Sequence, residues 1–568
     1  MDKINNVIPT FRDSQFAKFD RGELMLPFFL RRAKVKILIV IDNAGGFLSG
    51  SFNTAYFGLS KVLDTLRTEA DYYVEYDVKR AHRSLDPFKP PVADVTATAN
   101  YAPHYENFRF TGATKPADFN LDDYNQVWFF GLATTGVGLD NNELDVIAKW
   151  MDEKKGGVFA VGDHAEIGKA LCSNIPRVRK MRKWTAAQGV PSNSGTNRHD
   201  TLIKGHNNKY TFDDESDDIP MNIDVRYYPL RSFSPFFSRS QPHPLLCGKH
   251  GVIKVFPDHP HEGEVIEEAA VDITQNVSFV TYLNKPEFPT HNGHQETPDV
   301  IAHSFVQGDH TEGRGGATGT DQNKGPANAK RFPIVGAYDG HKSNIGRVAV
   351  DSTWHHWFDV NLVGRHYPGD GSFTDTGDAS KHVGFSFSAS GTQHFEQIKC
   401  YYKNMALWLN SPTKIAQLYL RACWGYVVRY PAVERFTLDT AIWELGESAL
   451  DAIGRRVGKC TVKQWILDLI ELPDRIRILK EPCLGCPPPE FFEIMVLGGT
   501  IREMLAYFYE QEKINEKIDE KKLLKYANTG LQKGMDEAIS LIERSYANNK
   551  ELVPTLKKEM KAKIKLEL

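Results

Sequence analysis

Two short runs of acidic and histidine residues, each following an apolar run typical of a buried strand, carry the side chains best suited to chemistry. The first run is Asp-His-Ala-Glu at 163–166, after the small and apolar residues 157–162. The second is His-His at 355–356, which follows the apolar run 348–350. Imidazole titrates near neutral pH and a neighbouring carboxylate can orient it, so these groups could act as general acid and base. The predicted catalytic residues are Asp163, His164, Glu166, His355 and His356.

The two adjacent histidines are not equivalent. Neighbouring residues of an extended chain point to opposite sides, so we expect at most one of His355 and His356 to face the turn at 163–166. The structural alternative is that Trp354 and Trp357 pack in the interior while a histidine only bonds to backbone. We favour function because two strand-end motifs of an open α/β sheet converge at one edge.

A second cluster, Asp-His-Pro-His-Glu at 258–262, places four potential metal ligands within five residues. The two histidines alternate, so an extended chain would put both on one side. Neutral imidazoles combined with carboxylates suit zinc, manganese or iron. A polar loop with hydrogen-bonded histidines is the alternative. The predicted ligands of a divalent metal are Asp258, His259, His261 and Glu262.

The segment Asp-Asn-Ala-Gly-Gly at 42–46 follows the first predicted strand and lies at the expected ligand edge of a sheet. Its glycines could let the backbone approach a ligand closely, although a tight turn is the alternative. The glycine-rich run 313–325 reads as a surface loop, because no Gly-Lys-Ser/Thr closes it as a phosphate cradle. The predicted ligand-binding residues are Asp42, Asn43, Gly45 and Asp351.

Alternating strand and helix patterns must position these groups. Residues 34–42, 72–78, 127–130 and 157–162 read as strands, and 54–70 and 141–153 read as helices. This alternation predicts an α/β fold with a doubly wound (flavodoxin-like) parallel sheet. Further strands are expected at 333–338 and 346–352, and a helix at 395–409.

The chain of 568 residues is too long for one core. We expect an N-terminal arm (1–33), an α/β domain (34–410) with a long loop-rich insert at about 175–330, and an all-α domain at 413–568. Amphipathic spacing recurs in this last part, where the apolar faces could bind a protein partner or build a homo-oligomer.

The composition of the chain indicates which binding partners and which cellular compartment to expect. A net charge of −3 gives no global attraction to nucleic acid or membrane, and no apolar stretch is long enough for a bilayer span. Seven cysteines are sparse, which favours a reduced, cytoplasmic setting. The single Cys-x-x-Cys at Cys483 and Cys486 fits a loop before a helix, with a metal or redox role as the alternative.

The order of these motifs resembles a ThuA-like domain of the class I glutamine amidotransferase-like superfamily. The similarity lies in the acidic-Tyr turn and strand at 123–130, the Gly-Gly strand and histidine turn at 156–164, the Gly-Arg-Val strand and histidine at 346–355, and the aromatic-ended helix 401–409. It spans roughly 34–410. The resemblance marks His355 as a site residue and associates the chain with sugar metabolism.

Two departures from that family matter. The amidotransferases carry a nucleophilic cysteine on the turn where this chain has Asp163 and His164, and Cys172 lies nine residues beyond Asp163. Thiolate-based glutamine hydrolysis is therefore disfavoured. Alignment of the Gly-Gly pairs also places Asp163, not His164, at the family's histidine position.

These features lead to two expectations. One is a hydrolase-like enzyme that acts on a small polar substrate, a carbohydrate or nucleotide derivative, through a His/Asp site at the sheet edge with possible metal assistance. The other is a non-catalytic module that binds a ligand and whose helical domain binds a partner or oligomerises. The absent nucleophile favours the module, and the density of histidines and acids at strand ends favours the enzyme.

Overall fold

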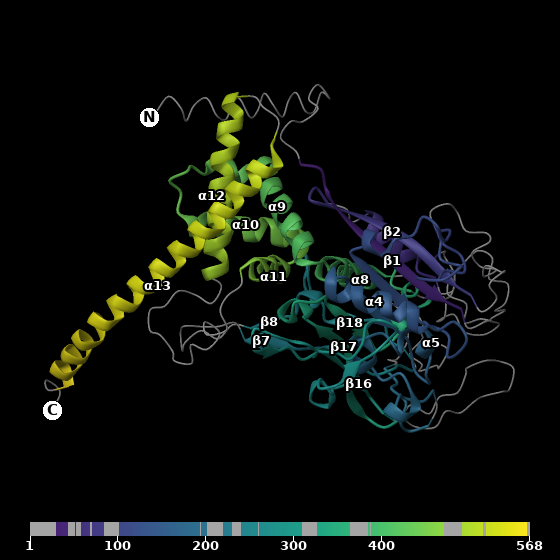
Figure 1. Ribbon diagram of the computed structural model, residues 1–568. Coiled ribbons are helices and arrows are strands. Elements are labelled where there is room, and N and C mark those ends of the chain that lie inside the picture. Colours follow the sequence, from purple (N-terminus) through teal and green to yellow (C-terminus); the bar gives the residue numbers. More distant parts are fainter. Residues whose placement is uncertain are drawn as a thin grey trace.

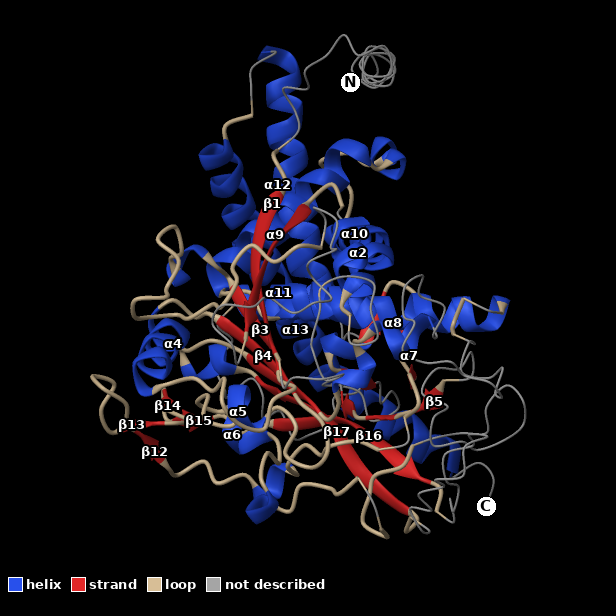
Figure 2. Ribbon diagram, turned by 90° about the vertical axis from the view of Figure 1, so that its right-hand side faces the viewer, coloured by secondary structure: helices blue, strands red, loops and turns tan. Residues whose placement is uncertain are grey.

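A mixed eight-stranded sheet forms the centre of the computed structural model (Figures 1 and 2). The structure describes residues 30–43, 52, 58–68, 71–84, 101–193, 195–201, 220–229, 240–259, 261–308, 327–363, 384–386, 388–470, 491–514 and 518–564. Gly45, the run 313–325 and the Cys483/Cys486 pair lie outside these residues, as does most of the predicted N-terminal arm.

Five neighbouring strands of the sheet are parallel, in the order β2-β1-β3-β4-β18. They are β1 (Ala33–Asp42), β2 (Val74–Arg83), β3 (Gln126–Phe130), β4 (Gly157–Val161) and β18 (Val348–Asp351). All residues of β3, β4 and β18 are buried, as expected of continuous apolar runs in a sheet covered on both faces.

The expectation of a purely parallel sheet is wrong, because three further strands extend the sheet and each pairs antiparallel with its neighbour. These are β17 (Lys330–Tyr338), β16 (Asp299–Val306) and β6 (Asp224–Val225), in the order β18-β17-β16-β6. The short connection from β17 to β18 suits an antiparallel pair, since a parallel pair needs a crossover of a dozen or more residues. The predicted insert thus contributes β16 and β6 to the central sheet, together with a series of short elements. The short helix α5 (Lys169–Cys172) precedes the insert. The short elements of the insert are α6 (Val178–Met181), β5 (Met221–Asn222), β7 (Tyr227–Pro229), β8 (Ser240–Pro242), β9 (Cys247–Gly248), β10 (Gly251–Val252), β11 (Val255–Phe256), β12 (Asn276–Val277), β13 (Lys285–Pro286), β14 (Thr290–His291) and β15 (His294–Gln295).

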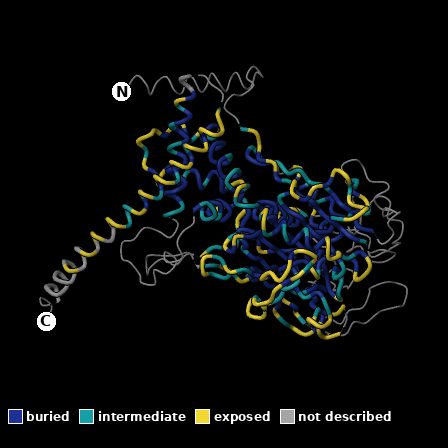
Figure 3. The backbone as a smooth tube through the Cα atoms, in the orientation of Figure 1, coloured by how far each residue is buried: buried dark blue, intermediate teal, exposed yellow. Residues whose placement is uncertain are grey.

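Helices cover both faces of the sheet, and the period-2 alternation of β1 shows how. Ile37, Ile39 and Ile41 join the core beneath α2 (Ser60–Thr68) and α8 (Ala389–Trp408). Leu38 and Val40 join the opposite core, beneath α4 (Asn141–Glu153). Figure 3 shows the resulting buried centre of the molecule. Buried strands between two helical layers place their carboxyl ends at one accessible edge.

The chain ends in a helical region made of α9 (Pro412–Arg429), α10 (Ile442–Val457), α11 (Lys459–Leu469), α12 (Phe491–Ile514) and α13 (Glu520–Ile564). Most of its buried apolar side chains belong to the same continuous core as the face of the sheet under α8, while Ile442, Met495 and Ala538 form a small separate cluster. α12 and α13 pack closely through glycines, and a Cβ at Gly499 would lie 2.4 Å from the carbonyl oxygen of Gly530. The distal part of α13 extends away from the rest of the molecule (Figure 1). None of the described helices combines the length and apolarity needed to cross a membrane.

Candidate metal centre

The ends of β4 and β18 bring two predicted site residues together. These strands are parallel neighbours in which Val161 pairs with Asp351, so the chain leaves both at the same edge. The Trp354 amide then donates to the carbonyl of Gly162 at 3.0 Å, which ties the two exits to each other. As a result, His355 Nε2 lies 3.7 Å from Asp163 Oδ2.

After β4 the chain makes a tight hydrogen-bonded turn and does not pass directly into a helix. The Asp163 amide donates to the Ile167 carbonyl at 3.0 Å, and Ala165 and Glu166 adopt positive φ angles of 47° and 67°. A Cβ at Gly162 would lie 2.4 Å from that same Ile167 carbonyl oxygen, so glycine is required for the close approach. The helix that follows the turn, α5, has four residues and begins at Lys169. The turn buries Asp163 completely and leaves Glu166 partly exposed.

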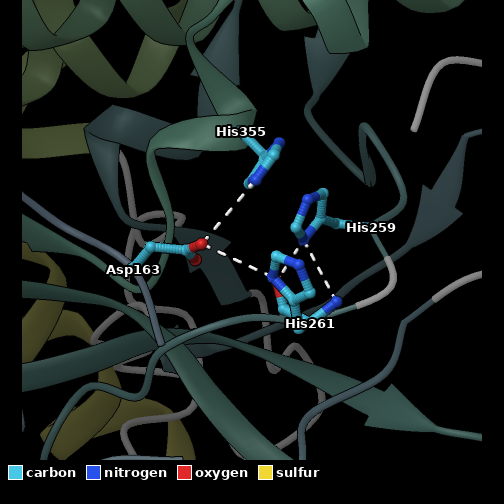
Figure 4. A group of neighbouring side chains, drawn as sticks. All are labelled: Asp163, His259, His261 and His355. Atoms are coloured by element: carbon cyan, nitrogen blue, oxygen red, sulfur yellow. Dashed lines mark hydrogen bonds and ion pairs between the residues drawn. The ribbon is translucent and has the colours of Figure 1, made fainter. Parts of the chain in front are cut away.

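The insert delivers two histidines to the same place. Thr201 holds this segment, because its amide donates to the His259 carbonyl at 2.9 Å and its hydroxyl accepts from the His259 amide at 3.0 Å. His261 Nδ1 then lies 3.5 Å from Asp163 Oδ2. Figure 4 shows the four side chains converging from β4, β18 and the insert. Each of Asp163, His259, His261 and His355 offers a ligand atom, and these atoms all lie within 4.8 Å of one another.

A hydrogen bond fixes the tautomer of one of these imidazoles. His355 Nδ1 contacts the amide oxygen of Asn361, which only accepts, so this Nδ1 carries the proton and His355 Nε2 presents a lone pair. His259 Nδ1 contacts both the carbonyl and the amide of His261. His259 Nε2, His355 Nε2 and Asp163 Oδ1 are all buried without a hydrogen-bond partner among the described residues. Unsatisfied buried polar atoms on three members of one group are costly without a ligand, and a bound metal would offset that cost.

The protonation states also suit a cation. Burial, followed by the charges of neighbouring histidines, holds the pKa of His259 well below its usual range. Burial likewise lowers the pKa of His355 well below the usual range. Burial would raise the pKa of Asp163, but the charge and hydrogen bond of His164, with the neighbouring His261 and His355, hold it well below the usual value. The group thus combines an ionised carboxylate, that of Asp163, with two imidazoles, those of His259 and His355, whose lowered pKa values favour the neutral form; these are the forms that bind metals.

His164 lies at the rim of this group. Its Nδ1 is 2.8 Å from Asp163 Oδ2, and its ring centroid is 3.7 Å from that of His261. His164 and His261 retain 6% and 9% exposure, while His259 and His355 are closed off almost completely. Solvent therefore reaches the group from the side of His164 and His261.

A separate buried network lies behind the group and includes three predicted site residues. His356 Nδ1 bonds to Asp351 Oδ1 at 2.8 Å, and Asp351 Oδ2 accepts from the Tyr401 hydroxyl at 3.0 Å. Glu262 accepts from the hydroxyls of Thr201 and Ser352, both at 2.9 Å. Burial raises the pKa of Glu262 to about 7. Glu262 and His356 are 3.9 Å apart and belong to this network, not to the four-ligand group.

Four other predicted site residues do not belong to the four-ligand group. The Glu166 carboxylate bonds to Lys169 at 2.9 Å and accepts from the Ala186 amide at 2.7 Å, on the outer side of the turn. Asp258 is buried, but its carboxylate is not a member of the four-ligand group. Asp42 accepts from the amides of Leu132 and Ala133, and thus joins the ends of β1 and β3. Asn43 follows it, half-buried, and also lies outside the group.

Sequence reasoning missed the residue that clamps the two strand ends. The buried guanidinium of Arg182 donates to the carbonyls of Asp163 at 2.8 Å, Ser352 at 2.6 Å and Asp351 at 2.9 Å, and it stacks on Trp184. Asn361 and Thr201, which orient His355 and the His259 segment, were missed as well. Each acts through contacts across the fold, and no local pattern distinguishes these residues in the sequence.

No family model matches the chain, and no curated protein or solved structure matches it either.

Proposed function

We propose that the chain is a metal-assisted, hydrolase-like enzyme that binds a divalent cation through Asp163, His259, His261 and His355. The observation that carries this proposal is that four potential ligand atoms lie within 4.8 Å of one another, while three of these residues each bury a side-chain atom without a hydrogen-bond partner among the described residues: Asp163 Oδ1, His259 Nε2 and His355 Nε2. Three imidazoles with one carboxylate suit zinc, manganese or iron. A divalent cation held there would supply Lewis-acid polarisation of a substrate carbonyl or phosphoryl oxygen.

The protein's own proton-transfer group is His164 in this proposal. Its Nδ1 faces Asp163 Oδ2, so the neutral ring carries its proton on Nδ1 and leaves Nε2 to accept one. The carboxylate orients the imidazole. His164 retains 6% exposure, whereas His259 and His355 retain 0% and 1%, so it lies closer to solvent than these two ligands. His355, whose Nε2 faces Asp163, acts as a ligand and not as an acid or base.

The substrate proposed is a small polar molecule, a carbohydrate or nucleotide derivative. The strand order β2-β1-β3-β4-β18, with helices on both faces, supports the flavodoxin-like, doubly wound arrangement of a ThuA-like domain. A carbohydrate is proposed because the ThuA-like family is associated with sugar metabolism. The five described cysteines form no disulfide, which supports a cytoplasmic setting.

A non-catalytic module is the second proposal, and the long α13 favours it. The exposed side chains of Leu524 and Ile539 lie on this helix, whose distal part extends from the body. In that case the helices from 413 onward bind a protein partner or a second copy, and the metal group binds a ligand without turnover. The two proposals differ in whether metal-loaded protein hydrolyses any substrate.

Metal analysis with a matched histidine variant tests the proposal. Purified wild type should contain about one zinc, manganese or iron ion per chain. His259→Ala should lose it, whereas His243→Ala should keep it, because His243 is a half-buried imidazole whose pKa is also lowered but which packs against Trp408. Equal metal content in all three proteins, or none in the wild type after metal supplementation, would reject the site.

A hydrolysis screen separates the two proposals. Phosphate, ester, amide and glycoside substrates are offered to the metal-loaded wild type, to chelated protein and to His164→Gln. We expect hydrolysis of one class, lost on chelation and restored by the metal, with a strong decrease in kcat for His164→Gln at full metal content. Stoichiometric metal without turnover of any substrate would favour the module.

A further inference from the structure

A cavity at the junction of the sheet and the helical region is separate from the metal group. It has a volume of about 440 Å³ and shares no residue with the four-ligand group. Its walls come from segments far apart in sequence: the turn before β2, the β9–β10 turn, α8, the end of α9 and the last turns of α10. This volume lies in the range of small-molecule sites.

The lining of this cavity is strongly basic. Four cationic side chains, Lys249, Lys403, Arg455 and Arg456, face it together with a single carboxylate, that of Asp71. The lining therefore carries a formal charge of +3, in a chain whose net charge is −3. Such local excess of one sign in a concave site raises the local concentration of counter-ions.

The cations differ in how firmly they are held. Lys403 is only 5% exposed, and its ammonium group donates to the Arg456 carbonyl at 3.3 Å. Arg456 bonds to Asp71 at 2.9 Å and lies over the ring of Tyr72, which fixes the orientation of its guanidinium. Arg455 bonds to Asp451 at 2.6 Å but is 72% exposed. The cavity thus combines an anchored inner ammonium, an oriented guanidinium and a more exposed guanidinium at its rim.

We propose that this cavity binds a phosphorylated small molecule. Guanidinium groups match the geometry of phosphate oxygens, and lysine adds a point charge. Tyr430, which also lines the cavity, offers a ring and a hydroxyl to the rest of the ligand. Because the walls belong to both the sheet and the helical region, the bound phosphate would join the two parts of the molecule. This site is independent of the metal-dependent hydrolysis proposed above.

Calorimetric titration of the full-length protein with inorganic pyrophosphate tests the proposal. The double variant Lys249→Gln/Arg455→Gln removes two cations whose side chains are not fully buried, so folding should be retained. The matched control, Lys115→Gln/Arg544→Gln, removes two exposed cations elsewhere on the surface. We expect one pyrophosphate per chain in the wild type and the control.

In the cavity variant the dissociation constant should rise at least about tenfold, because charge-assisted hydrogen bonds to phosphate are lost. Equal weakening in the control would show nonspecific charge attraction and overturn the proposal. Unchanged binding in the cavity variant would place the pyrophosphate at another site, the metal group included, and would also overturn it. Absence of saturable binding to the wild type would have the same consequence.

Discussion

Asn361 is the residue whose replacement tests the metal centre most sharply without removing a ligand. Its side-chain oxygen accepts from His355 Nδ1, and its amide group donates to the Asp258 carbonyl at 3.4 Å. Asn361 thus fixes the tautomer that turns His355 Nε2 toward Asp163, and it connects that histidine to the segment that carries His259. Asn361→Ala should leave all four ligands in place but release the ring of His355.

The expected magnitude follows from this contact. Removing a partner that orients a ligating histidine lowers metal affinity about 10- to 100-fold. Only one of three imidazoles is released here, so we expect the lower end, about tenfold or ~1.4 kcal/mol. Asn361→Asp keeps an acceptor oxygen for His355 Nδ1 and should retain most of the affinity.

Zinc affinity is measured by competition with a chromophoric chelator at fixed pH. Asn410→Ala is the matched control: Asn410 is also fully buried, and its amide group donates to the carbonyls of Ala406 and Leu407, in the turn after α8. Unchanged zinc affinity in folded Asn361→Ala would refute the reasoning. Equal losses in Asn361→Ala and Asn410→Ala would show a general effect of destabilisation, and would refute it too.

Three further outcomes are expected. Arg182→Met should lower the free energy of unfolding in urea by about 3 kcal/mol or more, because three buried carbonyls lose their donor; a loss below 1 kcal/mol would contradict the clamp. Burial raises the pKa of Asp359 from 3.8 to about 7, so the folded state binds the extra proton between these pH values. Stability should therefore fall by up to about 1.4 kcal/mol per unit as pH rises from 4 to 7, and Asp359→Asn should reduce that slope; an unchanged slope would exclude the assignment. Alkylation by iodoacetamide should leave any hydrolysis intact, since Cys172 is buried and the turn after β4 holds no thiol; inactivation that a bound substrate prevents would show a cysteine at the site.

The local elements of the fold follow from the sequence because they depend on short-range patterns. The apolar runs at 127–130 and 157–162 form β3 and β4, and the helix predicted at 141–153 is α4 with the same limits. Asp140 is the N-cap of α4 and forms a capping box with Glu143, so this helix-start signal lies within four residues of sequence. Periodicity and capping act over one or two turns of chain, so the linear sequence contains them.

The direction of the strands in the second half of the sheet was decided by tertiary structure. Residues 333–338 have the composition of a strand, but composition does not say whether the strand runs parallel or antiparallel. β16 was not predicted, although it pairs along its length with β17. Its place depends on partners contributed by distant segments, and strand pairing of this kind leaves little local signal.

For the metal group, too, the sequence indicated one part and the tertiary structure decided the rest. The sequence identified Asp163, His259, His261 and His355 as chemically able residues, because acids and histidines concentrate where buried strands end and in the insert. It grouped them by nearness in the chain and so placed Asp258 and Glu262 beside His259 and His261. Folding instead combines the two insert histidines with Asp163 and His355 from neighbouring strand ends. A ligand set is a distance relation among side chains, and only the packing of β4, β18 and the insert, held by Arg182, Thr201 and Asn361, determines those distances.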